Sequence, residues 1–478
     1  MNNSKADYCI QYNNQAVFVV TIISSLKRHK SDMDLQFPTT HTLRADLAPT
    51  PPMGWNSFDS YGVYLHEKAA LENLEAFAEK LLPRGYDTFV IDNGWFGEYR
   101  LKSGTLFPEE THAEEIRINE YGIVQPSKTY FPNGFGPIAK RARELGVRLG
   151  LHLMRGIPRK AVELDTPIQG STYRASEIAN QEDTCVWCHY NYGINTSHPG
   201  AQPFYDSLAQ QVADWGFEFI KADDIVPYPQ EIEALANAID NCESSITLSL
   251  SPGGKVFPKS ISSYHRGQML RVTKDIWDNQ HGIDQCFDAW RKWNGKSEPG
   301  FWIDMDMIPF GQLQLMTPPA DGVGTEESAR EAALAGEGEN RWCQLSDAQK
   351  ETFITLRSMS RSPLMIGGDL PTLDEHSLKL ITHPEMIDCN QNSKGADLIY
   401  DKDDWEIWRA VSSVDKTRGW LGIFNRRDEI RTLNADTGKL GLPDRTNLEN
   451  IWSPSQQALS LETAPNGCHF LAYTIPVS

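Results

Sequence analysis

The sequence predicts an α/β protein in which a (β/α)8 TIM barrel is followed by a small C-terminal antiparallel β-sandwich. From about residue 50, short apolar runs alternate with longer amphipathic segments, which is typical of a parallel sheet. Eight such runs favour a closed barrel, because an open doubly wound sheet usually carries a glycine-rich phosphate turn after its first strand, and none is found. After about residue 388, short runs separated by turn residues replace this alternation and predict the sandwich.

The sequence predicts a residue range for each strand and helix. The barrel strands are expected at residues 53–57, 88–92, 147–153, 217–223, 246–251, 269–273, 301–305 and 363–367. Helices are expected at 67–82, 135–145, 201–215, 229–241, 283–293 and 347–359, where apolar residues recur at helical spacing. Strands of the sandwich are expected at 397–400, 405–411, 420–424 and 469–475. Segment 317–340 is expected to be a long surface loop.

These ranges divide the 478 residues into three parts. Residues 1–48 form an N-terminal extension that is expected to be disordered or signal-like, 49–387 the catalytic barrel, and 388–478 the sandwich domain. Within the extension, residues 16–23 form a short apolar stretch of the kind found in secretory signals. No clear small-residue cleavage site follows it, so the sequence leaves secretion open.

The amino-acid composition of the chain limits the kinds of molecule that it can bind. The net charge of −19 argues against nucleic acid or an anionic membrane surface as the main partner. No apolar run is long enough to span a bilayer, and eight cysteines are too few for a disulfide scaffold. Thirteen tryptophans suit a protein that binds sugars, although core packing explains most of them more simply. A small neutral substrate fits this composition best.

Charged residues gather at the predicted strand ends. Residues 217–224, Phe-Glu-Phe-Ile-Lys-Ala-Asp-Asp, form an apolar run that ends in a lysine and two carboxylates. Burying these charges is costly unless they pair or face a polar pocket, and barrels place catalytic groups at the C-terminal ends of their strands. Further acids end other strands, namely Asp92, Asp275, Asp304, Asp306 and Asp369. Converging carboxylates fit either a metal cluster or a pair of acids acting on a glycosidic bond.

The metal alternative lacks the expected ligands. His152 on the third strand is one candidate, but no His-x-His or His-Glu-x-x-His pattern occurs. The glycosidase alternative requires only two acids and groups that bind hydroxyls. We therefore expect no metal and no cofactor, and we assign His152 to substrate binding.

Six motifs occur in order along the chain. They are Pro-Pro-Met-Gly-Trp-Asn-Ser (51–57), Val-Ile-Asp-Asn-Gly-Trp (90–95), Lys-Ala-Asp-Asp (221–224), Arg-Val-Thr-Lys-Asp-Ile-Trp-Asp (271–278), Asp-Met-Asp-Met (304–307) and Arg-Ser-Pro-Leu-Met-Ile-Gly-Gly-Asp (361–369). Over roughly residues 50–390 they resemble glycoside hydrolase family 27, the α-galactosidase and α-N-acetylgalactosaminidase family. Segments 150–159 and 249–254 look like those of a bacterial-type branch. The resemblance implies an extracellular or periplasmic protein.

The resemblance also implies a retaining mechanism. Asp223 falls where the family keeps its nucleophile, and Asp275 falls where it keeps its acid/base. Retention needs two carboxyl groups only about 5–5.5 Å apart, which neighbouring strand ends can provide. Lys221 would hold Asp223 ionised through its positive charge. Asp275 must stay protonated in the free enzyme, so a less polar setting is expected around it, for example from Trp277.

Other matching residues imply sugar contacts. Asp92 would accept hydrogen bonds from the O4 and O6 hydroxyls, and Arg271 would bind O2 or a neighbouring carboxylate. Asp306, with Met307, would close the pocket beside Arg271. Phe58 stands where the family usually has a tryptophan platform. As an alternative, Asp92 or Asp306 could cap the following helix.

Three departures from the family pattern leave the sugar open. Asn93 replaces the second acid of the usual Asp-Asp pair at the axial O4, and Asp224 stands where relatives carry a cysteine. Ser251 stands where galactosidases often carry glutamate and N-acetylgalactosaminidases carry serine. Cleavage of terminal α-D-galactose is the main expectation. An α-N-acetylgalactosaminidase, a β-L-arabinopyranosidase and a catalytically inactive carbohydrate-binding barrel are the alternatives.

Cys185-Val-Trp-Cys188-His189 literally matches the pattern of covalent haem attachment. Only one copy occurs, and a zinc knuckle would need a second cysteine pair. A pocket loop is the better interpretation, with Trp187 or Cys188 touching the sugar and a local disulfide between the two cysteines open. Oligomeric state, linkage and aglycone are not predicted.

Overall fold

The computed structural model describes residues 41–242, 244–252, 256–317, 338–434, 437–453 and 460–476. The possible signal core at 16–23 and most of the expected loop at 317–340 lie outside the described residues. The last residues of the predicted extension pack on the barrel, because the Ala48 carbonyl accepts a hydrogen bond from Trp302 Nε1 at 2.9 Å.

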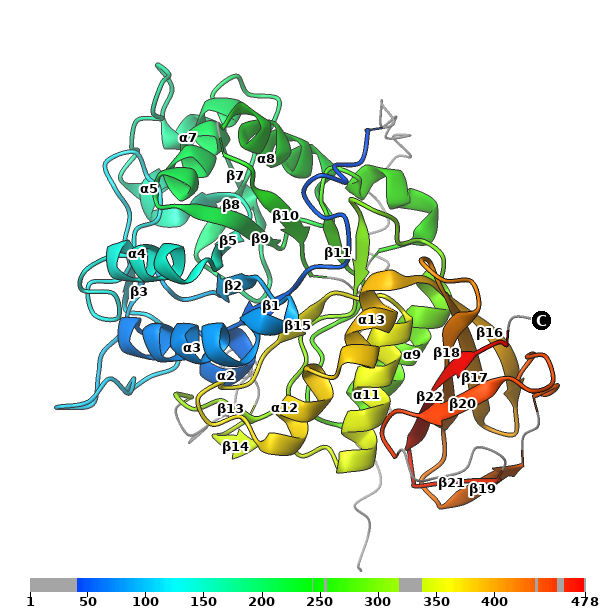
Figure 1. Ribbon diagram of the computed structural model, residues 1–478. Coiled ribbons are helices and arrows are strands. Elements are labelled where there is room, and N and C mark those ends of the chain that lie inside the picture. The colour runs from blue at the N-terminus through cyan, green and yellow to red at the C-terminus, as the bar shows by residue number, and fades with distance from the viewer. Residues whose placement is uncertain are drawn as a thin grey trace, which may run out of the picture. The chain divides into compact units, whose positions relative to one another are not determined.

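Eight parallel strands form one curled sheet, confirming the predicted barrel (Figure 1). Their order in the sheet is β12, β11, β10, β9, β5, β2, β1, β15, so strands that follow one another along the chain lie next to each other. The strands are β1 (Met53–Asn56), β2 (Thr88–Ile91), β5 (Arg148–Met154), β9 (Phe217–Asp223), β10 (Thr247–Leu250), β11 (Met269–Arg271), β12 (Trp302–Asp304) and β15 (Leu364–Ile366). Each one lies within or beside its predicted range.

The sheet closes through a short link beyond β12. Ile308 forms a single parallel bridge with Ile366 of β15. Its amide N donates to the Met365 carbonyl at 2.8 Å, and its carbonyl accepts from Gly367 N at 2.9 Å. Segment 305–308 therefore completes the barrel and places Asp306 at its C-terminal edge.

Six longer helices match the prediction. They are α3 (Glu67–Lys80), α4 (Gly136–Leu145), α7 (Ala201–Asp214), α8 (Pro229–Asn241), α9 (Gln280–Trp293) and α11 (Asp347–Met359). Helix α9 begins before the predicted residue 283, because the Asn279 side chain accepts a hydrogen bond from Gly282 N and caps the helix. None of the helices in the described ranges combines the length and apolarity that crossing a bilayer requires.

Several short elements were not predicted. The short helices are α2 (Phe58–Tyr61), η1 (Leu82–Arg84), α5 (Arg159–Glu163), α6 (Ala175–Ile178), η2 (Pro258–Tyr264), α12 (Glu375–Ile381) and α13 (Pro384–Asn392). The small antiparallel sheets are β3 (Gly97–Glu98) with β4 (Glu115–Ile116), β6 (Ile157–Pro158) with β8 (Asn191–Ile194) and β7 (Ala179–Thr184), and β13 (Gln312–Leu313) with β14 (Arg341–Trp342). The loop between β7 and β8 carries Trp187.

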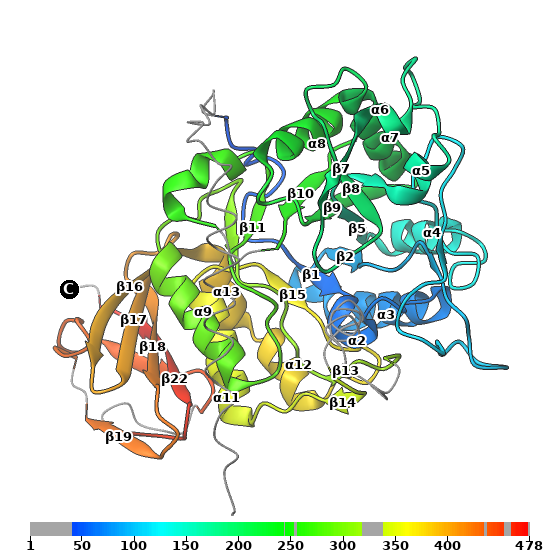
Figure 2. The same cartoon turned by 180° about the vertical axis from the view of Figure 1, so that it is seen from behind.

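The C-terminal domain is antiparallel, as predicted. Its larger sheet has the order β16 (Ser393–Lys402), β17 (Trp405–Ser412), β18 (Arg418–Asn425), β22 (Cys468–Thr474), β20 (Asn447–Asn450). Strands β19 (Arg431–Asn434) and β21 (Ser460–Thr463) form a second, two-stranded sheet. Helices α9 and α11 lie between the barrel strands and this domain (Figure 2). Trp290 of α9 stacks on Trp408 of β17 with ring centroids 3.8 Å apart, so one hydrophobic core extends from the barrel into the C-terminal domain.

Candidate active site

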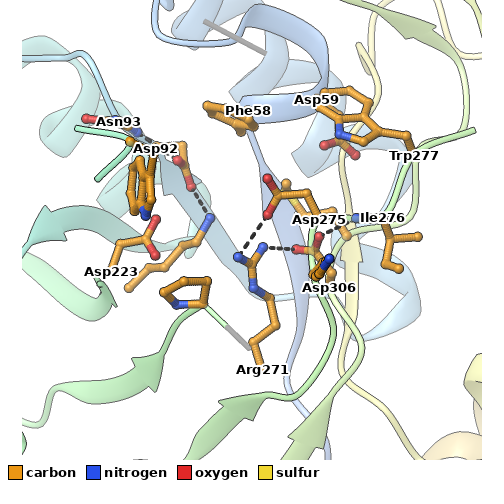
Figure 3. Close-up of a pocket in the computed structure, with 15 residues that line it drawn as sticks. Phe58, Asp59, Asp92, Asn93, Asp223, Arg271, Asp275, Ile276, Trp277 and Asp306 are labelled. Carbon is orange, nitrogen blue, oxygen red and sulfur yellow. Dashed lines mark hydrogen bonds and ion pairs between the residues drawn. The ribbon is translucent and has the colours of Figure 1, made fainter. Parts of the chain in front are cut away.

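A pocket of about 300 Å³ opens at the C-terminal ends of the barrel strands (Figure 3). Most of its wall comes from strand ends and the loops that follow them, the place where barrels carry their active sites. Its lining residues are Phe58, Asp59, Asp92, Asn93, Trp187, Lys221, Asp223, Pro252, Arg271, Lys274, Asp275, Ile276, Trp277, Asp306 and Met307. Nine of the eleven predicted site residues are in this lining.

Asp223, the last residue of β9, is held by two hydrogen bonds. Its Oδ2 lies 3.0 Å from Nε2 of the fully buried His152, and its Oδ1 accepts from Asp224 N at 3.0 Å. Burial raises the pKa of Asp223, but the His152 hydrogen bond and the positive charges of Lys221 and Arg271 hold that pKa well below its usual range. Asp223 is therefore ionised across the range in which most enzymes work, and His152 donates to it through Nε2.

Lys221 pairs directly with Asp92, not with Asp223. Its Nζ lies 2.7 Å from Asp92 Oδ2, which also accepts from Asn56 Nδ2 at 2.6 Å. Burial lowers the pKa of Lys221, but the charges of Asp92 and Asp223 raise it to about 12. Lys221 acts on Asp223 through space by its charge, as the sequence predicts, whereas the hydrogen bond from His152 was not predicted.

Arg271 bridges two acids on the other side of the pocket. Its Nη2 lies 2.9 Å from Asp275 Oδ1, and its Nη1 lies 2.9 Å from Asp306 Oδ1. Asp306 Oδ2 in turn accepts from Ile276 N at 2.8 Å. Arg271 thus binds neighbouring carboxylates, and it ties the loop that bears Asp275 to the closing link of the barrel.

Asp275 has a raised pKa despite this ion pair. The Arg271 charge lowers the pKa, but desolvation and the like charges of Asp306 and Asp223 outweigh it. The side chain itself is 61% exposed, because it faces the open pocket. Its environment therefore favours the protonated acid more than the environment of Asp223 does. Figure 3 shows Asp223 beside Asp92 and Asp275 across the pocket from it.

Two aromatic side chains complete the wall near these acids. Phe58 lies at the start of α2, and its ring centroid is 6.4 Å from that of Trp277. Trp187 lines the pocket from its loop, between Cys185 and Cys188. Both cysteines are buried free thiols, so the local disulfide that their spacing allowed is not formed.

His152 and Ser251 lie behind the wall and do not line the pocket. His152 contacts Asp223, as described, and Ser251 has a buried Oγ without a hydrogen-bond partner. The residue that follows Ser251, Pro252, lines the pocket instead. The Asn93 carbonyl Oδ1 accepts from Gly94 N at 2.8 Å, so one of its two lone pairs is already occupied.

Sequence reasoning missed several pocket residues. Lys274 and Ile276 lie on either side of Asp275, and Asp59 follows Phe58, so their motifs could have indicated them. Asp59 is 1% exposed and its Oδ2 has no hydrogen-bond partner. Burial and the charge of Asp306 raise the pKa of Asp59 well above its usual range.

Asp224, which had no assigned role, binds a buried arginine. Arg155 Nη2 lies 3.0 Å from Asp224 Oδ2, and Arg155 Nη1 lies 2.9 Å from Asp183 Oδ2 and 2.7 Å from Glu231 Oε1. The Tyr228 ring packs against the guanidinium, 3.4 Å from its carbon. Arg155 thus links the end of β9 to β7, the strand that leads into the Trp187 loop.

The remaining strand-end acids are structural. Asp369 accepts from Tyr61 Oη at 2.6 Å and from Thr372 Oγ1 at 2.7 Å. Asp304 accepts from Asp306 N at 2.9 Å beneath the pocket. Among the described residues no group of three or more His, Cys, Asp or Glu side chains is arranged to hold a metal ion.

Two carboxyl groups with opposed pKa shifts, at the C-terminal face of a barrel and among groups that bind hydroxyls, are the arrangement of a barrel glycoside hydrolase. No family model matches the chain. The structure is similar to a β-L-arabinopyranosidase of glycoside hydrolase family 27 from Geobacillus stearothermophilus, in complex with arabinose. The two are 30% identical with a TM-score of 0.81, over 91% of this chain and 100% of the other.

Two further relatives also carry the names of glycosidases. A candidate α-N-acetylgalactosaminidase from Bacillus halodurans is 30% identical with a TM-score of 0.75, over 90% of this chain and 98% of the other. An α-galactosidase from Cyamopsis tetragonoloba is 23% identical over 86% of this chain and 82% of its own length. The chain belongs to glycoside hydrolase family 27 and is most like its bacterial members among these relatives.

Proposed function

We propose that this glycoside hydrolase is a retaining exo-enzyme that removes terminal α-D-galactosyl residues by double displacement. The observation that carries the proposal is that Asp223 and Asp275 line the same pocket while their surroundings move their pKa values in opposite directions. The first step of a retaining mechanism requires one ionised carboxylate and one protonated carboxylic acid, both placed at the same glycosidic bond.

In the first step, Asp223 Oδ attacks the anomeric carbon and the bond from that carbon to the glycosidic oxygen breaks. Asp275 gives its proton to the departing oxygen, so the aglycone leaves as an alcohol and the sugar stays as an ester on Asp223. In the second step, Asp275 takes a proton from water, and the water oxygen attacks the anomeric carbon. The ester bond breaks, and Asp223 returns to its ionised form while Asp275 regains its proton.

The pocket supports exo cleavage of one sugar ring. Its volume of about 300 Å³ lies at the lower end of the usual range for ligand sites, which suits a single pyranose. Lys221 and Asp92 offer neighbouring hydroxyls a cationic donor and an anionic acceptor, already placed 2.7 Å from one another. Phe58 and Trp187 offer apolar surface to the C–H faces of the sugar.

A β-L-arabinopyranosidase is the second candidate. β-L-arabinopyranose has the ring configuration of α-D-galactopyranose but no C6 hydroxymethyl group. The observation that favours it is the likeness to the arabinose-bound β-L-arabinopyranosidase of Geobacillus stearothermophilus, which is 30% identical over 91% of this chain.

Initial rates on nitrophenyl α-D-galactoside, β-L-arabinopyranoside and α-N-acetyl-D-galactosaminide test the substrate. If the protein is an α-galactosidase, the galactoside will have the highest kcat/KM of the three substrates. A highest kcat/KM on the arabinopyranoside would replace this candidate with the second one. A highest kcat/KM on the acetylated substrate would exclude both candidates.

Asp223→Ala tests the mechanism, with Asp288→Ala as the control because Asp288 is an exposed aspartate of α9. We expect Asp223→Ala to abolish turnover on every substrate and the control to keep full activity. If Asp223→Ala retained near wild-type rates, the nucleophile assignment would be wrong. Sugar binding without any turnover by the wild-type protein would identify an inactive carbohydrate-binding barrel.

A further inference from the structure

Asp224 directly follows the proposed nucleophile, and the chain bends there as it leaves β9. Its φ angle is +58°, in the left-handed region that L-residues other than asparagine and aspartate rarely adopt. Its amide N donates to Asp223 Oδ1 at 3.0 Å. The residue with the unusual backbone conformation is therefore also the one whose N–H contacts the nucleophile.

The peptide unit between Asp223 and Asp224 is bonded at both of its polar ends. Its carbonyl oxygen, which belongs to Asp223, accepts from Arg155 N at 3.0 Å, and its N–H donates to Asp223 Oδ1. A peptide unit is planar and turns as a whole. Turning this one by about 180° would break both hydrogen bonds and move φ of Asp224 from +58° to roughly −120°, which any L-residue adopts readily. The contact with the nucleophile and the left-handed conformation are thus kept or lost together.

The same arginine also holds the Asp224 side chain. Arg155 Nε and Nη2 lie 3.2 and 3.0 Å from Asp224 Oδ2. The Arg155 side chain is 1% exposed and the Asp224 side chain 16%, so solvent screens this ion pair less than one at the surface. Arg155 therefore fixes the peptide unit through its backbone N–H and the residue that follows through its guanidinium.

Both oxygens of the nucleophile are held by these contacts and one other. Oδ1 accepts from Asp224 N, and Oδ2 lies 3.0 Å from His152 Nε2. A carboxylate oxygen has two lone pairs, so each oxygen keeps one for the sugar. Two donors on different oxygens fix the plane of the carboxylate, and a fixed plane keeps the attacking oxygen aligned with the anomeric carbon.

We propose that Asp224 is a positioning residue for the nucleophile, an inference that rests on the proposed function of Asp223. Arg155 holds Asp224 in the left-handed conformation, and this conformation keeps the amide N–H of Asp224 on Asp223 Oδ1. The described lining of the pocket does not include Asp224, so it acts through Asp223 and not on the sugar.

Three substitutions separate the backbone conformation of residue 224 from its charge. Asp224→Gly and Asp224→Ala both remove the carboxylate, but glycine accepts a positive φ without steric cost and alanine does not. Asp224→Asn removes the charge and keeps a side chain that tolerates this conformation. We expect kcat/KM to fall less than about fivefold in the Gly and Asn variants and about tenfold or more in the Ala variant.

Rates are measured on the nitrophenyl glycoside that the wild type cleaves fastest, at a temperature where circular dichroism shows every variant to be folded. Asp165→Ala is the matched control. Asp165 also has a positive φ, of +46°, and pairs with an arginine, since its Oδ2 lies 2.7 Å from Arg174 Nε, but it lies outside the described pocket lining. It should lose stability and keep its kcat/KM.

The pH profile reports the contact itself. The acid limb of kcat/KM should lie at higher pH in Asp224→Ala than in Asp224→Gly, because only alanine costs the ionised Asp223 its amide hydrogen bond. The other titratable or charged groups that face Asp223 are the same in both variants, namely Asp92, His152, Cys188, Lys221, Arg271 and Asp275.

Crystal structures of the two variants give a readout that needs no turnover. The distance from residue 224 N to Asp223 Oδ1 should stay within hydrogen-bond range in Asp224→Gly and be lost in Asp224→Ala.

Four outcomes would overturn the inference. They are wild-type kcat/KM in folded Asp224→Ala, equal losses in the Gly and Ala variants, an equal loss in Asp165→Ala, and an Ala variant that keeps the amide contact. Any of them together with an inactive Asp223→Ala would remove only the role of Asp224. An active Asp223→Ala would instead overturn the nucleophile assignment and this inference with it.

Discussion

His152 Nε2 lies 3.0 Å from Asp223 Oδ2, and the imidazole is completely buried on the neighbouring strand β5. The proposed nucleophile is therefore held by a hydrogen bond that its own strand does not supply. This contact, with the more distant charges of Lys221 and Arg271, keeps the pKa of Asp223 below its usual range.

Replacing His152 should move the acid limb of the activity profile. In His152→Phe, Asp223 loses a hydrogen bond to its ionised form, so its pKa rises and activity falls at a higher pH as the solution is acidified. A hydrogen bond to a charged group contributes about 1.5–3 kcal/mol, so we expect kcat/KM to fall about 10- to 100-fold. His152→Gln keeps a donor and should lose less.

The pH dependence of kcat/KM for both variants measures this effect. His66→Asn is a useful control, because His66 caps α3 through its side chain and asparagine also caps helices well. An acid limb that does not move in a folded His152→Phe protein would contradict the role of His152.

Asp275 should control the basic limb. It must carry a proton to assist departure of the aglycone, so activity is lost as the pH rises through its raised pKa. Asp275→Ala should remove this limb on a dinitrophenyl glycoside, whose leaving group needs no proton, and azide should accelerate its turnover. If the basic limb persisted in Asp275→Ala, another group would be the acid.

Asn93→Asp should raise activity on the galactoside and the arabinopyranoside alike. The new carboxylate could accept from Gly94 N with one oxygen and from the axial O4 hydroxyl, which both sugars carry, with the other. We expect kcat/KM on each substrate to rise about tenfold. Asn447→Asp, an exposed change in β20, should leave both values unaltered. Unchanged values in Asn93→Asp would mean that position 93 does not contact the sugar.

Arg155→Met should destabilise the fold and slow the reaction. It leaves Asp183, Asp224 and Glu231 without their shared cation, and breaking a buried charge network of this kind costs about 3–5 kcal/mol. The loss should be largest at neutral pH and shrink in acid, because protonation removes the unpaired negative charges.

Thermal unfolding at several pH values checks the effect of Arg155→Met. Arg141→Met is the control, because Arg141 pairs with Glu75 at the surface and such pairs contribute about 0–1 kcal/mol. Equal losses in the two variants would show that the buried network has no special role.

The fold could be predicted because its signal is local and repeated. Each of the eight strands is an apolar run, and each of the six longer helices carries helical periodicity or begins at a recognisable turn. Strands of two residues, such as β13 and β14, leave no such pattern, since neighbours elsewhere in the chain decide their pairing.

The site was predictable where its residues end strands, and less so elsewhere. Asp223 and Asp275 stand in motifs, but Arg155 binds three acids that lie 28 to 76 positions away, and no local pattern encodes such a contact. Ser251 lies behind the wall and the next residue, Pro252, lines the pocket, because which side chain at a strand end faces the pocket depends on the local backbone.

The link that closes the barrel also has an evolutionary consequence. Segment 305–308 joins β12 to β15 through the single bridge of Ile308, and the same segment supplies two residues of the pocket wall. The strands that this bridge joins are β12 and β15, the two ends of the eight-stranded sheet, so a substitution there changes the sugar site and the integrity of the barrel together. New specificities should therefore arise more easily at Trp187 or Phe58, which no closing strand requires, while the link stays fixed as lineages diverge.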